Sequence, residues 1–277
     1  MESPTHGSAP IAINTLGRFE VLLNGAPLYF NGKTPHKPLD LLKGLLGSAG
    51  RGIARHVLCD ALWPDLECWA ARQALNTAVF RLRRILGCKQ AIRMNGEELL
   101  LDADRCRVDA WDFEIELLHS DGPEALLRAL RRYHGSFLAD SEHPLAFDAR
   151  ERLRRKFVRG VLQLGETYAR RADLNAAIDL LHFALDAEGT SEELHRALID
   201  YLGRAGSLAA GAAAYQRCHA VLNHHFGAAP SQATDRVYRN GLPRRDGVAR
   251  GEPVTARGGT PPDPVSRDLK ASFPARG

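Results

Sequence analysis

Between Cys68 and Gly96 the sequence contains six basic residues and no acidic one. Arginines in such a block can neutralise phosphate groups, and side-chain amides among them can form paired hydrogen bonds with a base edge. The block is centred on the stretch from Ala70 to Gly87, AARQALNTAVFRLRRILG. Its chemistry suits a surface for a polyanion, and the simpler alternative is a solvated face of an ordinary helix.

This stretch has the periodicity of an amphipathic helix. At about 100° per residue, Leu75, Val79, Leu82 and Leu86 fall on one side. The other side contains no carboxylate, although opposite charges three or four residues apart would stabilise an exposed helix. We therefore expect the apolar side to face a core and the other side to face DNA. The residues expected at this interface are Arg72, Gln73, Asn76, Thr77, Phe80, Arg81, Arg83, Arg84 and Arg93.

The residue types at this interface suggest a division of roles. Gln73 and Asn76 can contact adenine bidentately, an arginine can read guanine, and Thr77 or Phe80 can meet a thymine methyl group. Arginines on the flanks of the helix are better suited to the phosphate backbone. These flanking residues are Arg72 and Arg83, and Arg93 would reach phosphate or a minor groove.

The elements around this helix predict a winged helix-turn-helix. Asn24-Gly25 and Asn95-Gly96 are two-residue turn sequences typical of hairpins, and Pro38 is suited to the first turn of a helix. The last hairpin would be the wing that follows the recognition helix. The predicted elements are strands at 19–23 and 28–30, helices at 38–47, 55–62 and 70–87, and strands at 91–94 and 98–101.

After Val108 the periodicity becomes helical, and two segments match at an offset of 34 residues. The segment 164–174 aligns with 198–208, and in this register Leu181 falls on Tyr215. A period of about 34 residues is typical of tetratricopeptide (TPR) helix pairs. The predicted fold is therefore an α+β N-terminal winged helix-turn-helix followed by an all-α TPR-like helical array.

Composition limits the classes of protein that fit. The chain has 277 residues, a net charge of +4 and five cysteines. The cysteines have neither zinc nor disulfide-framework spacing, and no stretch has the length and apolarity of a membrane span. We expect a cytoplasmic protein that is nucleoid-associated when bound to DNA. The expected domains are a disordered segment at 1–10, the winged helix at 11–104, the helical domain at 105–240 and a disordered tail at 241–277.

Separated motifs in the chain resemble the SARP class, the Streptomyces antibiotic regulatory proteins, which pair an OmpR-type winged helix with a bacterial transcriptional activator domain (BTAD). The resemblance covers about residues 11 to 240. The motifs are TLGRFEVLLNG (15–25), ALWPDLECWAARQALNTAVFRLRRILG (61–87), YHGSFL (133–138) and AAYQRCHAVLNHHFGAAPSQAT (213–234).

The resemblance implies sequence-specific binding to double-stranded DNA at promoter repeats and activation through contact with RNA polymerase. A homodimer on DNA is expected. Phe80 stands where a small polar residue is expected, and Arg107 stands where related sequences often have tryptophan. By position, Asn76, Thr77 and Arg81 would face the bases, and Arg72, Arg83, Arg84 and Arg93 would support contacts with the backbone.

Other functions are weaker alternatives. The rival hypothesis is a TPR-type protein–protein adaptor whose winged helix does not bind DNA. We expect no enzyme activity, no cofactor and no metal site, because the chain has no GxxxxGK[ST] loop and His224-His225 has no partner at ligand spacing. An unknown effector on the helical domain is compatible with DNA binding. The basic stretch 151–159 is either a solvated helix face or an auxiliary contact with DNA or polymerase.

Overall fold

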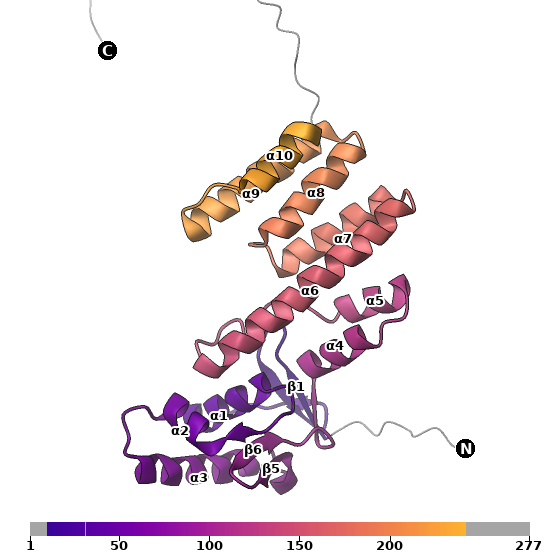
Figure 1. Cartoon of the computed structure of the whole chain (residues 1–277). Coiled ribbons are helices and arrows are strands. Elements are labelled where there is room, and N and C mark those ends of the chain that lie inside the picture. Colours follow the sequence, from indigo (N-terminus) through magenta and orange to yellow (C-terminus); the bar gives the residue numbers. More distant parts are fainter. Residues whose placement is uncertain (1–9, 31, 242–277) are drawn as a thin grey trace, which may run out of the picture. The chain divides into compact units, whose positions relative to one another are not determined.

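The computed structural model describes residues 10–30 and 32–241 and consists of an N-terminal winged helix-turn-helix followed by a helical array (Figure 1). The predicted fold class is confirmed. The predictions of disorder for 1–10 and 241–277 lie outside the described residues, apart from Pro10 and Gly241. In the described part of the chain, every helix is too short or too polar to cross a membrane.

The N-terminal sheet has the strand order β3-β2-β1-β7, with β7 parallel to β1. Its first turn, Asn24-Gly25, has positive φ at both residues, so Leu23 lies directly opposite Ala26. The strand predicted at 28–30 is therefore wrong, because the pairing begins immediately after the turn. The strands are β1 (Ile11–Asn14), β2 (Glu20–Leu23), β3 (Ala26–Pro27) and β7 (Cys106–Val108).

The helix-turn-helix and the wing follow this sheet, and the three predicted helices are present with ends shifted by two residues at most. The wing turn is Gly96-Glu97 rather than Asn95-Gly96, because Asn95 pairs with Glu98. A short strand, β4, was not predicted and completes a sheet of order β4-β6-β5. The elements are α1 (His36–Gly47), β4 (Ile53–Ala54), α2 (Arg55–Leu62), α3 (Cys68–Ile85), a short 3₁₀ turn (Lys89–Ala91), β5 (Ile92–Asn95) and β6 (Glu98–Leu101).

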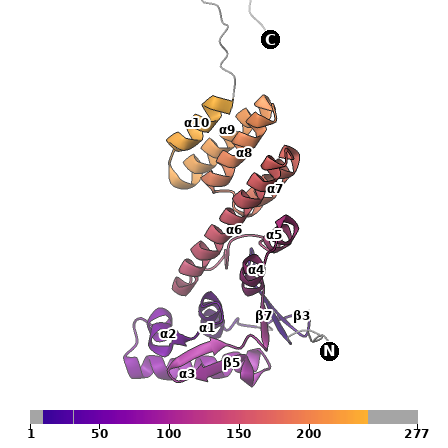
Figure 2. The same ribbon diagram turned by 45° about the vertical axis from the view of Figure 1, so that its right-hand side comes forward.

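The helical array repeats with the predicted offset. Helix α6 ends at Arg170 and α8 at Arg204, and α7 begins at Leu174 and α9 at Leu208, so both boundaries recur after 34 residues. The successive helices lie side by side in both ribbon views (Figures 1 and 2). Their bounds are α4 (Asp109–Leu118), α5 (Pro123–Leu130), α6 (Pro144–Arg170), α7 (Leu174–Ala187), α8 (Glu192–Arg204), α9 (Leu208–Phe226) and α10 (Gln232–Gly241).

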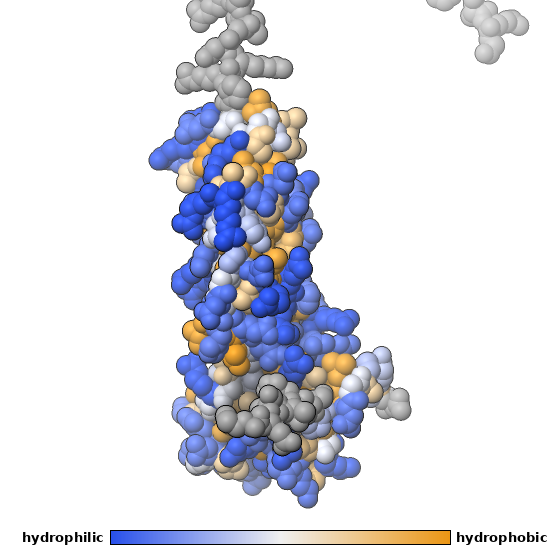
Figure 3. Space-filling model, turned by 90° about the vertical axis from the view of Figure 1, so that its right-hand side faces the viewer, coloured by the Kyte–Doolittle hydropathy of each residue, from blue (hydrophilic) through white to orange (hydrophobic). Residues whose placement is uncertain are grey.

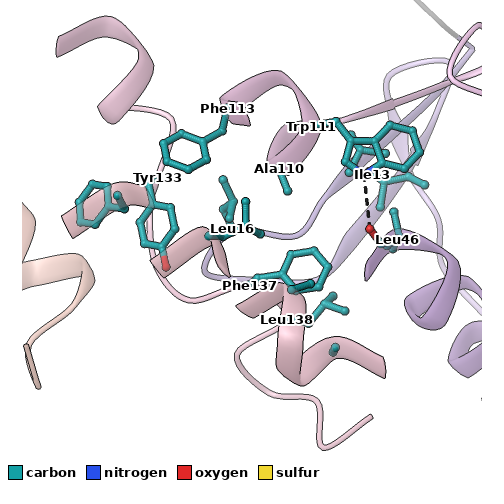
Figure 4. Packing of buried hydrophobic residues seen from close by; sticks show 14 of the residues in the cluster. Ile13, Leu16, Leu46, Ala110, Trp111, Phe113, Tyr133, Phe137 and Leu138 are labelled. Atoms are coloured by element: carbon teal, nitrogen blue, oxygen red, sulfur yellow. Dashed lines mark hydrogen bonds between the residues drawn. The ribbon is translucent and has the colours of Figure 1, made fainter. Parts of the chain in front are cut away.

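Two sequence motifs meet where the N-terminal sheet joins the array (Figure 4). The Leu138 amide donates to the Thr15 carbonyl at 2.8 Å, and the Gly17 amide donates to the Ser136 carbonyl at 3.2 Å. A β-carbon on Gly135 would lie 3.0 Å from the Gly17 α-carbon, so this crossing requires glycine. The motifs TLG and YHGSFL therefore form one joint between the two parts of the chain.

The Asp109 carboxylate completes this joint from the start of α4. It accepts hydrogen bonds from the Thr15 amide at 2.8 Å, the Thr15 hydroxyl at 2.6 Å and the Leu16 amide at 3.0 Å. Thr15 and Leu16 are buried, so these donors have little access to water. The domain boundary expected between residues 104 and 105 stays a prediction, although β7 lies beyond it and pairs with β1.

A second attachment connects α1 with α6 and α4. The indole Nε1 of Trp111 donates to the Leu46 carbonyl at 3.3 Å, as the dashed line in Figure 4 shows. Gly47 lies so close to α6 that a β-carbon there would be 2.6 Å from the Leu145 carbonyl oxygen. The winged helix therefore contacts the array at two separate places.

The basic stretch 151–159 lies on α6 and has internal ion-pair partners. Glu114 on α4 accepts from Lys156 at 2.6 Å and from Arg152 at 3.2 Å, and these contacts hold the pKa of the Glu114 carboxyl below its usual value against the opposing effect of its burial. Arg154 pairs with the buried Glu188 at 3.3 Å. This part of α6 therefore fastens neighbouring helices, and a plain solvated face does not describe it.

Candidate nucleic-acid interface

Helix α3 is fixed in rotation by its apolar side. Leu75 and Leu82 are fully buried, and Val79 and Leu86 are nearly so, against α1 and α2. The side predicted from the helical wheel is thus the one that faces the core. Because the apolar side packs on the core, the polar side of α3 must face outward.

The exposed side of α3 contains most of the expected interface residues. The helix has 18 residues, which corresponds to a length of about 27 Å and a diameter that fits a major groove. Arg93 is exposed on the adjacent strand β5, and Arg83 is half-buried. The expected interface residues that are exposed on α3 are Arg72, Gln73, Asn76, Thr77, Phe80, Arg81 and Arg84, and Cys68 and Trp69 in its first turn are exposed as well.

Two of the expected phosphate contacts have carboxylate partners from outside α3. Arg72 pairs with Glu97 of the wing turn at 3.0 Å, and Arg93 approaches Asp102 at 3.7 Å. The exposed side of α3 has no carboxylate of its own, as predicted, and these two partners come from the wing turn and from the residue after β6. Arg72 and Glu97 are both exposed, and such a pair contributes about 0–1 kcal/mol, so a phosphate can replace the Glu97 carboxylate. Asp102 is buried, whereas the Arg93 side chain is exposed.

Arg83 has a position different from the other arginines. Its Nη2 donates to the Ile92 carbonyl at 2.7 Å, while its Nε is buried without a hydrogen-bond partner among the described residues. The side chain therefore connects α3 to the first residue of strand β5. This contact sets the position of the wing relative to α3.

Arg55 belongs to the same surface, although sequence reasoning missed it. It is the first residue of α2, and its Nη2 donates to the Asn76 Oδ1 at 2.8 Å. The sequence contains one indication of such a role: Arg55 is a cation at the N-terminus of a helix, although the helix dipole favours an anion at that position. Arg55 therefore orients the Asn76 amide and adds a positive charge at its side.

Thr77 and Phe80 give the centre of this surface an apolar character. The Thr77 hydroxyl donates to the Gln73 carbonyl at 3.0 Å, which leaves the methyl group as the part available for an external contact. Phe80 is 62% exposed. An apolar side chain this exposed on a basic helix face has no role in the core of the domain.

The comparisons with known proteins agree with this architecture. Residues 118–240 match the family model described as the bacterial transcriptional activator domain. The match confirms the part of the resemblance that concerns this domain, which here follows a winged helix.

One solved structure gives a more particular likeness. The structure of Mycobacterium tuberculosis EmbR in complex with a low affinity phosphopeptide matches with a TM-score of 0.60 at 20% sequence identity. The match covers 84% of this chain and 65% of the EmbR chain, so this chain spans less than two thirds of that protein's length. At this identity the likeness concerns the fold. No curated protein sequence matches the chain.

Proposed function

We propose that this protein binds double-stranded DNA in a sequence-specific manner, with α3 in the major groove and the β5–β6 wing beside it, and that it activates transcription. The observation that carries the proposal is the exposed side of α3, which has cations, amides and no carboxylate of its own. A helix in this position of a winged helix-turn-helix is the one that reads base edges.

Arg81 and Arg84 are the main support for contact with phosphate. They lie one turn apart on the exposed side, and like charges at this spacing destabilise a helix. Among residues 10–30 and 32–241, neither arginine forms a salt bridge. Backbone phosphates would supply the missing negative charge, and counterion release would make binding favourable.

Base reading is assigned to the amide end of the same surface. Asn76, oriented by Arg55, has the donor and acceptor pair that recognises adenine in the major groove. Gln73 lies one turn before it with the same chemistry. Arg72 would exchange its exposed carboxylate partner for a phosphate, and Arg93, whose own side chain is exposed, would contact a phosphate of the same duplex.

The helical array has the remaining roles in this proposal. We assign to it contact with RNA polymerase, the formation of a homodimer on DNA, and binding of an unidentified effector. Activation, rather than repression, rests on the description of the matched domain. The protein would act in the cytoplasm, associated with the nucleoid when bound to DNA.

The salt dependence of DNA binding tests the proposal. With about five phosphate contacts, the logarithm of affinity should fall with the logarithm of salt concentration at a slope of about −4.5. Replacing Arg81 and Arg84 together by alanine should make the slope shallower by about 1.8. The measurement is fluorescence anisotropy with genomic DNA fragments recovered on the purified protein.

A matched pair of substitutions controls for loss of net charge. Arg170→Ala with Arg171→Ala removes the same charge at the exposed end of α6, which is the end not joined to α1. This control should keep the wild-type affinity and slope. If the wild-type protein binds no genomic fragment at low salt, or if both pairs behave alike, the adaptor hypothesis is favoured instead.

A further inference from the structure

Phe80 lies among the cations and amides of the proposed interface, and recognition by hydrogen bonds and charges does not explain it. Its ring lies at the middle of the exposed side, 62% exposed. Hydrophilic residues predominate on the molecular face drawn in Figure 3, with hydrophobic ones between them. A large apolar ring among cations costs solubility and adds nothing to the core, which favours a contact with an apolar group of a ligand.

The surroundings of Phe80 form an apolar strip with a basic border. On its N-terminal side lies Thr77, whose hydroxyl is bonded to the helix backbone and whose methyl group remains available. On its C-terminal side is a shallow hollow of about 450 Å³ between the end of α3 and the 3₁₀ turn. The residues that line this hollow are Phe80, Arg83, Arg84, Gly87, Cys88 and Lys89.

The border of this strip determines what kind of partner fits. Arg84 and Lys89 are exposed at the edge of the hollow, and Arg81 follows Phe80 directly. A partner must therefore combine a dense negative charge with small apolar groups at its surface. The major groove of DNA has this combination, because the C5 methyl group of thymine projects into it between two phosphate backbones.

We propose that Phe80, with the Thr77 methyl group, is a specificity-determining residue that selects thymine by contact with its C5 methyl group. The inference rests on the DNA binding proposed above and names the base feature that this face reads. Asn76 and Phe80 are four residues apart, or about 6 Å along the helix axis. Because base pairs are spaced by about 3.4 Å, the selected thymine should lie within about two base pairs of the adenine that Asn76 contacts.

Deletion of a single methyl group from the DNA tests this contact directly. The full chain would first select its sites from a random duplex library. Each thymine of the selected site would then be replaced, one at a time, by deoxyuridine, which differs only in lacking the methyl group. One replacement should weaken binding of the wild-type protein about fourfold, as expected for one buried methyl group.

Substitutions in the protein connect this effect to Phe80. Phe80→Ala should bind the thymine and deoxyuridine sites with nearly equal affinity, whereas Phe80→Leu should keep most of the difference. Leu118→Ala, at an exposed apolar residue of α4, should preserve the full fourfold difference. The side chain of Phe80 is largely in solvent, so these variants should fold like the wild type.

The outcomes separate the two proposals. Enrichment of no sequence from the library would overturn DNA binding itself, and the thymine contact with it. Selection of a defined site in which no thymine shows a methyl effect would overturn only the contact. A methyl effect that persists unchanged in Phe80→Ala would also overturn it, because another residue would then make the contact.

Discussion

Replacement of Asp109 by alanine should destabilise the protein strongly, although Asp109 is only partly buried at the first residue of α4. The carboxylate accepts from the Thr15 amide, the Thr15 hydroxyl and the Leu16 amide, and all three donors belong to buried residues. In Asp109→Ala these donors stay in the folded protein without their acceptor. In the unfolded chain the same donors would bond to water.

The magnitude follows from the number of orphaned donors. A buried donor left without a partner costs about 1–2 kcal/mol, so three of them amount to about 3–6 kcal/mol. Thr15→Val removes only the hydroxyl donor and should cost about 1 kcal/mol. Asp112→Ala is the matched control, because Asp112 lies one turn along α4 and pairs with the exposed Arg107 at 2.7 Å. This control should cost less than about 1 kcal/mol.

Urea unfolding followed by circular dichroism measures these differences as changes in the free energy of unfolding. The variants should rank Asp109→Ala, then Thr15→Val, then Asp112→Ala, from most to least destabilised. If Asp109→Ala loses no more stability than Asp112→Ala, the carboxylate is not the acceptor on which this joint depends. The TLG motif would then be held in place by other contacts.

Two further predictions concern stability. Gly47→Ala places a β-carbon 2.6 Å from the Leu145 carbonyl oxygen and should lower the free energy of unfolding in urea by about 1–3 kcal/mol. The control Gly211→Ala, whose β-carbon would have its nearest neighbour 3.8 Å away, should be neutral or slightly stabilising. Equal effects of the two substitutions would contradict the close approach of α1 and α6. Burial lowers the pKa of His195, so the folded protein binds a proton less readily than the unfolded chain and stability should fall as the pH decreases through about 6.5. His195→Gln should lose stability less steeply between about pH 7.5 and pH 5.5 in urea titrations, and an unchanged slope would assign the pH dependence to other groups.

The helices could be predicted from the sequence because their signals are local. The apolar stripe of α3, the start of α2 at Arg55 and the 34-residue offset of the array each depend on spacing within one segment. Strands β4 and β7 could not be predicted, because each has three residues or fewer and is stabilised by a distant partner. The strand expected at 28–30 was misplaced because the geometry of the Asn24-Gly25 turn, which sets the pairing register, puts the second strand at Ala26–Pro27 instead.

The exposed side of the candidate interface was predictable, but its internal contacts were not. The wheel identifies which residues of α3 face outward, and their exposure agrees with it. The partners of Arg72, Arg83 and Asn76 come from the wing and from α2, and no spacing along α3 indicates them. The role of Gly135 in YHGSFL likewise becomes visible only when Gly17 lies against it.

The joint between TLG and YHGSFL limits how this protein can be divided. A fragment cut after residue 104 would lose β7 from the edge of β1, the acceptor for Thr15 and the segment that covers Leu16. Such a fragment exposes an unpaired strand edge, which favours self-association. A chimaera that attaches this winged helix to another array should therefore keep the chain through Leu138, so that the unit exchanged contains both halves of the joint.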